Sequence, residues 1–312
     1  MELPFYDLVD VLVYDPVPTS RAVTRSALYS LGCRRIEFVT DLGDFHDGIA
    51  QGRPDLVVCE VGPEAASLCK LTQAVRQGSR IPNPFVLVLM TAWSVNSETV
   101  GLISNAGADD LILRPFSTST LGQRIETLVS RSRRFIVNSN YIGPERRKPD
   151  QGRVSDAITL ETVNSIQIKA QARYRSEDIA SQVDSALQRG RLQLSIEKLC
   201  CDTRRLLSLG RGLLDTPAGT TKRQLIEQMV LLVTAMDHRA QDAEIVGVRN
   251  PILALRAALA SVQAETHGRG AIEQLEQAGA ELLRHIEHAI TTDAEQPHIE
   301  APHDRKDAVG IP

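Results

Sequence analysis

Four polar side chains stand at the ends of short apolar runs in the amino-terminal part of the sequence. Asp15 follows DVLVY (10–14), Glu60 closes DLVVCE (55–60), Thr91 follows FVLVLM (85–90), and Arg114 closes DLILR (110–114). In an open parallel sheet the carboxyl ends of the strands meet at one edge, where ligands gather. An arginine there can meet a carboxylate with two parallel hydrogen bonds. The sequence therefore predicts a polar pocket built from these four residues.

The elements that would position this pocket follow the pattern of a parallel α/β sheet. Short β-branched runs alternate with amphipathic stretches of helical spacing. The expected strands span 10–14, 35–39, 55–60, 85–90 and 110–114, with helices between them and a last helix near 117–131. The strands are apolar almost throughout, which is typical of a sheet covered on both faces. We therefore predict an α/β fold with a five-stranded, doubly wound, flavodoxin-like sheet.

The second half of the sequence has a different character. Residues 132–154, rich in Arg, Asn, Gly and Pro, have the composition of a linker. From 155 to 292 the apolar residues recur at helical spacing, which predicts an all-α domain for output or oligomerisation. Residues 293–312 lack an apolar period and are expected to be disordered. At 312 residues the chain is long enough for two folded units.

Composition restricts the partners and the cellular compartment. The net charge of −4 gives no basic field for nucleic acid or an anionic membrane, so such binding would need a local patch. No apolar run is long enough for a transmembrane helix, and no signal peptide is recognisable. The cysteines have neither the spacing of a zinc site nor that of a disulfide framework. They are Cys33, Cys59, Cys69, Cys200 and Cys201. We expect a cytoplasmic protein.

Residues 8–131 resemble the receiver domain of two-component response regulators. The resemblance rests on VLVYDPVPTSR, PDLVVCE, IPNPFVLVLMTA and AGADDLILRPF taken together. In that family, two acids after strand one and an aspartate ending strand three hold Mg²⁺, and this aspartate accepts a phosphoryl group from a histidine kinase. A Thr or Ser after strand four and a Lys after strand five contact the phosphoryl group. By this resemblance Asp15 is the second acid, Thr91 is the hydroxyl, and Arg114-Pro115 is the turn, with a cis peptide expected.

The departures from the family pattern fall in the pocket. Tyr14 stands where the first acid is expected, Glu60 replaces the phosphoacceptor aspartate, and Arg114 replaces the lysine. Leu111 takes the position of an aromatic residue that reports phosphorylation in the family. With Asp15 as the remaining acid, Mg²⁺ binding is expected to be weak, and no other cofactor is expected. Glu60 is longer than Asp by one carbon, about 1.5 Å, which moves its oxygens out of line for phosphoryl transfer.

Two interpretations of Glu60 stay open at this point. Its carboxylate can place a permanent negative charge beside Thr91 and Arg114, where a phosphoryl group would otherwise lie. Alternatively, Glu60 and Arg114 form a structural ion pair in a pocket that has lost its activity.

Three further patterns outside the sheet carry alternatives. His285 and His288, with Glu281 one turn earlier, share a helix face that could hold a metal, although a polar surface is the simpler interpretation. His238 is a candidate phosphorelay histidine in the helical half. YIGPERR (141–147), which resembles a segment that follows the receiver in some bacterial response regulators, is either a cap on the receiver or a docking strip.

The sequence thus predicts an atypical response regulator that acts by binding and not by catalysis. Its receiver would engage signalling proteins, a histidine kinase or a downstream protein, without phosphorylation. The helical half would form a homodimer or bind another protein. Two alternatives are a phosphorelay component with another acceptor, such as Asp15 or His238, and a transcriptional regulator that binds DNA through the basic linker.

Overall fold

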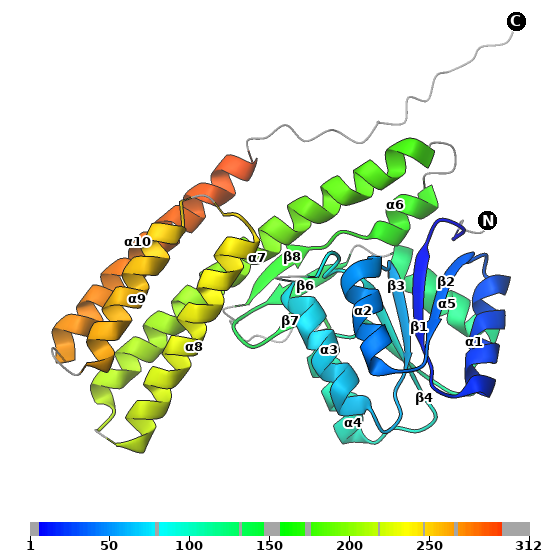
Figure 1. The fold of residues 1–312 in the computed structure, drawn as a ribbon, viewed down its shortest axis with the longest axis horizontal. Coiled ribbons are helices and arrows are strands. Elements are labelled where there is room, and N and C mark those ends of the chain that lie inside the picture. The colour runs from blue at the N-terminus through cyan, green and yellow to red at the C-terminus, as the bar shows by residue number, and fades with distance from the viewer. Residues whose placement is uncertain are drawn as a thin grey trace, which may run out of the picture.

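The computed structural model describes residues 6–78, 81–130, 133–146, 157–171, 176–217, 219–245, 247–264 and 268–294. Its larger sheet has five parallel strands in the order β2-β1-β3-β4-β5 (Figure 1). The strands are β1 (Asp10–Tyr14), β2 (Arg35–Val39), β3 (Leu56–Glu60), β4 (Leu87–Ala92) and β5 (Asp110–Leu113). The predicted five-stranded α/β fold is confirmed.

Strand β4 begins and ends two residues later than the sequence predicts. The Asn83 side chain accepts a hydrogen bond from the Phe85 backbone N–H, which holds residues 83–85 in a turn before the strand. The shift places Thr91 inside the strand, directly opposite Glu60 in the β3–β4 ladder. Two of the predicted pocket residues are therefore neighbours across the sheet.

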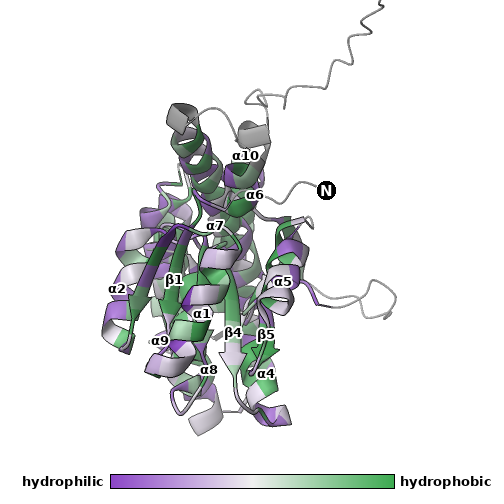
Figure 2. Cartoon of the chain, turned by 90° about the vertical axis from the view of Figure 1, so that its right-hand side faces the viewer, coloured by the Kyte–Doolittle hydropathy of each residue, from purple (hydrophilic) through white to green (hydrophobic). Residues whose placement is uncertain are grey.

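Helices cover both faces of this sheet. Helices α1 (Pro18–Ser30) and α5 (Thr118–Ser130) pack on one face, against Val11, Val13 and Ile112. Helices α2 (Leu42–Gly52), α3 (Ala65–Gln77) and α4 (Ser97–Ala106) pack on the other, against Leu12, Tyr14 and Val57. The strands are mainly green (hydrophobic) in Figure 2, and the helices alternate apolar and polar residues. This two-sided burial explains the nearly continuous apolar strands.

A second, smaller sheet follows where the sequence predicts a linker. Strands β6 (Arg134–Val137), β7 (Ile142–Pro144) and β8 (Ile158–Glu161) are antiparallel, in the order β7-β6-β8. The prediction of an irregular linker over 132–154, followed by helices alone from 155, is therefore wrong in this region. The polar residues 138–141 form a hairpin turn between β6 and β7, in which the Asn138 side chain accepts from the backbone N–H groups of Asn140 and Tyr141, and Gly143 and Pro144 lie within β7. Residues 147–156 lie outside the described part.

A buried ion network attaches the small sheet to the large one. Arg76 of α3 donates to Asp109 at 2.8 Å and to the carbonyls of Gly107, Pro84 and Val86. Arg133, just before β6, donates to the other oxygen of the same carboxylate. The Asp109 side chain is 2% exposed, and two guanidinium groups compensate its charge.

The YIGPERR segment caps the receiver-like domain. Its Arg146 side chain donates to Ser104 Oγ, near the end of α4, at 2.9 Å and to the Ala108 carbonyl, between α4 and β5. Ile142 is buried in the small-sheet core. Of the two interpretations of this segment, the structure favours the cap for residues 141–146, and Arg147 lies outside the described residues.

The rest of the described chain is helical. After α6 (Ser165–Gln171) come α7 (Ser176–Asp215), α8 (Thr220–Asp242), α9 (Arg249–Gln263) and α10 (Gly268–Ala294). Each of the last four packs against the next, and α10 returns to pack against α7, which closes a four-helix bundle (Figure 1). Among the described helices, none is long and apolar enough to cross a membrane. The predicted disordered tail, apart from Asp293 and Ala294 in α10, lies outside the described residues.

Helix α7 is shared between two cores. Ile179, Val183, Leu187 and Leu194 pack with Phe85 and Phe135 under the receiver-like domain. Further along the helix, Leu199, Leu206 and Leu213 belong to the core of the bundle. At the crossing point, a Cβ on Gly190 would lie 2.7 Å from Phe85 Cε2, so only glycine lets the helix approach this closely. The bundle and the receiver-like domain are therefore joined by a continuous helix.

A lysine clamp closes the amino-terminal edge of the large sheet. Lys169 of α6 donates from Nζ to Asp10 Oδ2 and to Asp55 Oδ2, both at 2.6 Å. Asp10 begins β1, and Asp55 directly precedes the neighbouring strand β3. The segment after the small sheet thus supplies the cation that compensates two adjacent carboxylates.

Candidate functional site

The structure brings Asp15, Glu60, Thr91 and Arg114 together at the carboxyl-terminal edge of the large sheet. Asp15 follows β1, Glu60 ends β3, Thr91 lies near the end of β4, and Arg114 follows β5. All four are buried, with exposed fractions of 7% or less. The Arg114–Pro115 peptide is cis, as the sequence predicts. The parallel topology accounts for this convergence, because all four strands end at the same edge.

Glu60 is held by the other pocket residues through one oxygen. Its Oε2 accepts from Thr91 Oγ1 at 2.5 Å and from Arg114 Nε at 2.5 Å. Because the Glu60 side chain is only 4% exposed, the surrounding protein screens this ion pair weakly. The Glu60 carboxylate thus binds a hydroxyl and a cation contributed by the next two strand ends of the sheet.

Arg114 connects the two carboxylates of the pocket. Its Nη2 donates to Asp15 Oδ2 at 3.2 Å, to Thr24 Oγ1 at 2.9 Å and to Thr91 Oγ1 at 3.1 Å. The ring of Phe116 lies 4.8 Å from the guanidinium carbon. The guanidinium is thereby fixed by hydrogen bonds within its plane and by an aromatic ring.

Two residues of the pocket do not figure in the sequence prediction. Ser20 donates from Oγ to both oxygens of Asp15, at 2.7 and 2.6 Å, and Thr24 accepts from Arg114. Both side chains are buried and lie one turn apart on α1. Two hydroxyl residues spaced i, i+4 on the inner face of the helix after Asp15 are the signal that could have identified them.

Tyr14 does not lie in the pocket. Its ring packs 5.3 Å from the ring of Phe45 of α2, in the apolar core on one face of the sheet. Burial raises the pKa of Tyr14, with smaller contributions from Glu64 and Asp41. The prediction that Tyr14 occupies an acid position of the pocket is therefore wrong, because its side chain points into the α2 face. The residue after Asp15 is Pro16, which has no side-chain oxygen either.

Leu111 lies below the pocket. The leucine is half-buried and packs against the core between the sheet and α2, α3 and α4. Because its side chain has no ring and no polar atom, it cannot make a hydrogen bond to the pocket. Leu111 therefore contributes apolar packing to the core in this chain.

The pocket residues do not fit a Mg²⁺ ion. Mg²⁺ needs near-octahedral oxygen ligands, normally including a carboxylate with a free lone pair and several waters. Here the edge of the Arg114 guanidinium formed by Nε and Nη2 donates to both Glu60 and Asp15. Across the described residues, no group of three or more His, Cys, Asp or Glu side chains is arranged to hold a metal. The expectation of weak Mg²⁺ binding at Asp15 therefore finds no support in this geometry.

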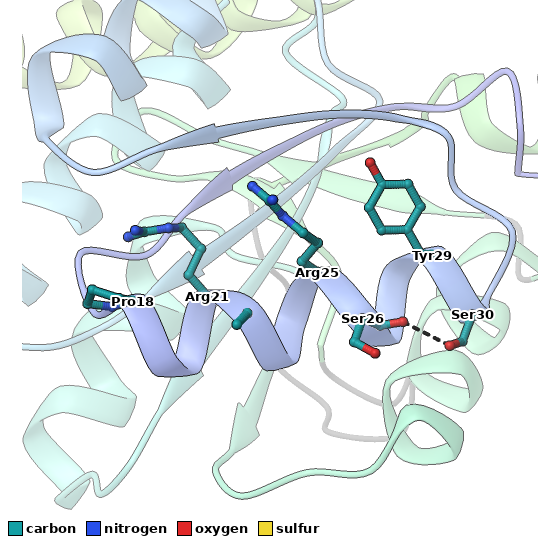
Figure 3. Close-up of a pocket in the computed structure, with 7 residues that line it drawn as sticks. Pro18, Arg21, Arg25, Ser26, Tyr29 and Ser30 are labelled. Atoms are coloured by element: carbon teal, nitrogen blue, oxygen red, sulfur yellow. Dashed lines mark hydrogen bonds between the residues drawn. The ribbon is translucent and has the colours of Figure 1, made fainter.

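An open hollow on α1 lies beside the pocket without reaching it. Figure 3 shows Arg21, Arg25 and Tyr29 projecting along the same side of the helix, with Ser26 and Ser30 joined by a hydrogen bond of 2.9 Å. Arg21 donates to the Asp15 carbonyl, and Arg25 lies over the ring of Phe38. None of the four pocket residues lines this hollow.

The histidine candidates lie in the helical bundle. His238 is exposed on α8, next to Arg239, which donates to the Gln77 carbonyl at the end of α3. The helices of the sheet run opposite to its strands, so the carboxyl end of α3 lies at the amino-terminal edge of the sheet, away from the pocket. His238, the neighbour of Arg239, therefore lies on the side of the domain away from Glu60. His285 Nδ1 contacts the Glu281 carbonyl at 2.9 Å, a contact within the helix.

Comparison with known proteins points to response regulators. The chain is 33% identical over 155 residues to the response regulator MprA of Mycobacterium sp. strain KMS, covering 49% of this chain and 57% of that protein. It is 35% identical over 127 residues to MprA of Mycolicibacterium vanbaalenii, covering 40% and 52%. The chain thus spans about half the length of the curated relatives it matches. No protein-family model matches the sequence.

Two solved structures align with the amino-terminal part of this chain over almost their whole length. A signal receiver domain from Clostridium thermocellum is 21% identical, with a TM-score of 0.34, and the alignment covers 39% of this chain and 97% of that one. A response regulator from Thermotoga maritima is 21% identical, with a TM-score of 0.35, covering 40% and 100%. The amino-terminal half has the receiver fold. At the carboxyl end of its strand β3 stands a glutamate, Glu60, whose hydrogen-bond partners Thr91 and Arg114 both belong to this domain.

Proposed function

We propose that this chain is an atypical response regulator whose receiver domain binds signalling proteins without being phosphorylated. The observation that supports it is the double hydrogen bond at Glu60 Oε2, which engages both Thr91 and Arg114 inside a buried pocket. A glutamate that already binds the hydroxyl and the cation leaves an incoming phosphoryl group without partners. The receiver would therefore hold one conformation of its pocket permanently.

The chemistry of phosphoryl transfer supports the same conclusion. In-line attack needs a carboxylate oxygen aimed at the phosphorus, and metal ions that neutralise the developing charge. Asp15 already accepts from Ser20, from the Val17 backbone N–H and from Arg114, and it is 0% exposed. Glu60 is 4% exposed. Neither acid is presented to a phosphodonor.

An apolar corner beside the pocket is the surface we assign to the partner. Trp93 follows β4, and Leu113 of β5 pairs with Ala92 in the ladder, so the two side chains belong to neighbouring positions. They are 60% and 52% exposed. Large apolar side chains that are exposed at neighbouring positions are typical of protein-binding sites. The helical bundle docks at the opposite edge of the sheet and leaves this corner accessible.

The test of phosphorylation uses the full chain with acetyl phosphate and Mg²⁺. We expect no gain in intact mass, and no change in the fluorescence of Trp93, the single tryptophan, which lies two residues after Thr91. A receiver domain of known activity is the positive control. Stoichiometric phosphorylation of Glu60 or Asp15 would contradict the proposal.

A parallel reaction with phosphoramidate addresses the phosphorelay alternative. This donor phosphorylates histidine, and His238 is exposed. We expect no specific, stoichiometric product at His238. If His238 is modified and passes its phosphoryl group to another receiver, the chain is a phosphorelay component instead.

The test of the binding surface compares two substitutions of exposed leucines. Leu113→Asp should abolish capture of signalling proteins by the immobilised chain, whereas Leu231→Asp, at a 71% exposed position on α8, should leave it unchanged. Prior phosphatase treatment of the chain should have no effect on capture. Equal capture by both variants, or loss after phosphatase treatment, would contradict the assignment.

A further inference from the structure

We propose that Arg114 is a built-in counter-ion that takes the place of a metal ion, and that removing its guanidinium converts the pocket into a divalent-cation site. This inference deepens the proposed function and rests on it, because the proposed function and the counter-ion role both require that Arg114 stays bound in the pocket. It assigns to Arg114 a role beyond pairing with Glu60, since its guanidinium holds two carboxylates from different strands.

The need for a cation follows from burial. Asp15 is 0% exposed and Glu60 is 4% exposed, and both carboxylates meet the same guanidinium. Two carboxylates brought this close in a dry environment repel each other, and each loses its hydration. In the described part of the chain, Asp15 and Glu60 each form an ion pair with Arg114. Nearby Arg21 donates to the main-chain carbonyl of Asp15 and not to its carboxylate.

The shape of the guanidinium explains why an arginine suits this position. Nε and Nη2 lie on one edge of the planar group, so one edge can serve two acceptors. Here Nε serves Glu60, and Nη2 serves Asp15, Thr24 and Thr91. Asp15 directly follows β1, and the other three acceptors lie in α1, β3 and β4. A single side chain therefore connects four elements at the edge of the sheet.

Truncation of Arg114 would leave a shell of oxygen atoms. The two carboxylates and the hydroxyls of Thr24 and Thr91, which all contact Arg114, remain around the vacated volume, and all are from buried side chains. Hard divalent cations prefer oxygen ligands and can keep several waters in their coordination shell. The same site that rejects a metal in the native chain is then suited to Mg²⁺ or Mn²⁺.

The experiment measures metal binding to the full chain and to Arg114→Ala. Mn²⁺ binding is followed by electron paramagnetic resonance, and the thermal midpoint is recorded with and without Mg²⁺. We expect no saturable Mn²⁺ binding to the pocket of the native chain. For Arg114→Ala we expect one bound Mn²⁺ per chain and a thermal midpoint that rises with Mg²⁺, since a ligand that binds the folded state stabilises it.

Two further variants separate the counter-ion role from a general loss of packing. Arg114→Ala combined with Glu60→Gln removes one carboxylate and should lose the bound Mn²⁺. Arg114→Lys keeps a cation, so it should bind no Mn²⁺ and should fold even if Arg114→Ala requires Mg²⁺ to do so. A folded Arg114→Ala chain that binds no Mn²⁺, or Mn²⁺ binding that persists in the double variant, would overturn the inference.

The outcome is independent of the phosphorylation test. Uptake of a phosphoryl group by the native chain would refute the proposed function, whatever the metal affinity of the variants. Absence of metal binding in Arg114→Ala would refute only the counter-ion role.

Discussion

At the scale of single residues, the pocket is a set of mutually satisfied charges. Glu60 and Asp15 are each bound to Arg114, and the hydroxyls of Ser20, Thr24 and Thr91 occupy further hydrogen-bonding positions. A buried network of this kind is stabilising only while every member is present. Substitutions in the pocket should therefore change stability and partner binding together.

Glu60→Gln tests the charge of the glutamate at nearly constant shape. The amide keeps an acceptor oxygen but loses the ionic part of the bonds to Arg114 and Thr91, so we expect a loss of roughly 1.5–3 kcal/mol in unfolding free energy. Partner capture should change as well, because the pocket borders the apolar corner. Urea denaturation and the capture assay measure both effects. Native stability together with native capture would show that the charge has no role.

Glu60→Asp tests whether shortening this side chain by one carbon allows the pocket to accept a phosphoryl group. We expect no efficient phosphorylation by acetyl phosphate, because Arg114 still occupies the space between the two acids and Pro16 supplies no third one. Intact mass after incubation with Mg²⁺ measures the result. Rapid stoichiometric phosphorylation of this variant would mean that the length of the Glu60 side chain alone prevents phosphorylation in the native chain.

At the scale of elements, the clamp at the amino-terminal edge of the sheet should show a characteristic pH dependence. Burial raises the pKa of Asp55 above 3.8, and Lys169 opposes that shift. A raised pKa in the folded state means that the contribution of Asp55 to stability is complete below pH 3.8 and is lost as the pH rises through the folded-state value. Without Lys169 the pKa rises further and the loss grows.

Lys169→Met should therefore destabilise the chain more at pH 7 than at pH 4. The side chain of Asp55 is 2% exposed, so at pH 7 it would be a buried carboxylate without its cation, a situation that costs on the order of 3–5 kcal/mol. Urea denaturation at the two pH values measures the difference. Lys70→Met, at an exposed position of α3, is the control and should change stability little at either pH.

Replacing a glycine of helix α7 by alanine should lower the stability of the protein at one site and raise it at another. Gly190→Ala places a methyl group 2.7 Å from the Phe85 ring and should cost about 1–3 kcal/mol through overpacking. Gly212→Ala, in the same helix with nothing within 4 Å of the new Cβ, should instead stabilise by roughly 0.5–1 kcal/mol. Thermal denaturation compares them. Equal effects would mean that α7 does not cross Phe85 so closely.

Some helices and strands could be predicted from the sequence more reliably than others. Strands β1, β3 and β4 are apolar runs that are buried almost throughout, and all five parallel strands alternate with amphipathic helical stretches, so all five are predicted. Strands β6, β7 and β8 have four, three and four residues, they are not flanked by amphipathic helical stretches in a repeating pattern, and the sequence between β6 and β8 has the composition of a linker. Asp15, Glu60, Thr91 and Arg114 could be predicted because each stands at the end of a strand, whereas Ser20 and Thr24 depend on how α1 packs.

At the scale of the whole molecule, the shared helix α7 should make unfolding cooperative. Its first half is buried with Phe85 and Phe135, and its second half completes the bundle. We expect Trp93 fluorescence, which reports on the receiver domain, and far-ultraviolet circular dichroism, dominated by the bundle, to give coincident denaturation curves. Two separated transitions would indicate that the receiver domain and the bundle unfold independently.

The lysine clamp also has a consequence for the order in which the protein is made. A ribosome that has released the chain only through α5 has delivered β1 and β3, with Asp10 and Asp55 side by side, but not Lys169. Arg114, the cation at the carboxyl-terminal edge of the sheet, has by then been synthesised, because it follows β5. A nascent receiver domain can thus complete its pocket before its opposite edge is neutralised, and its final stability is reached only after α6 has left the exit tunnel.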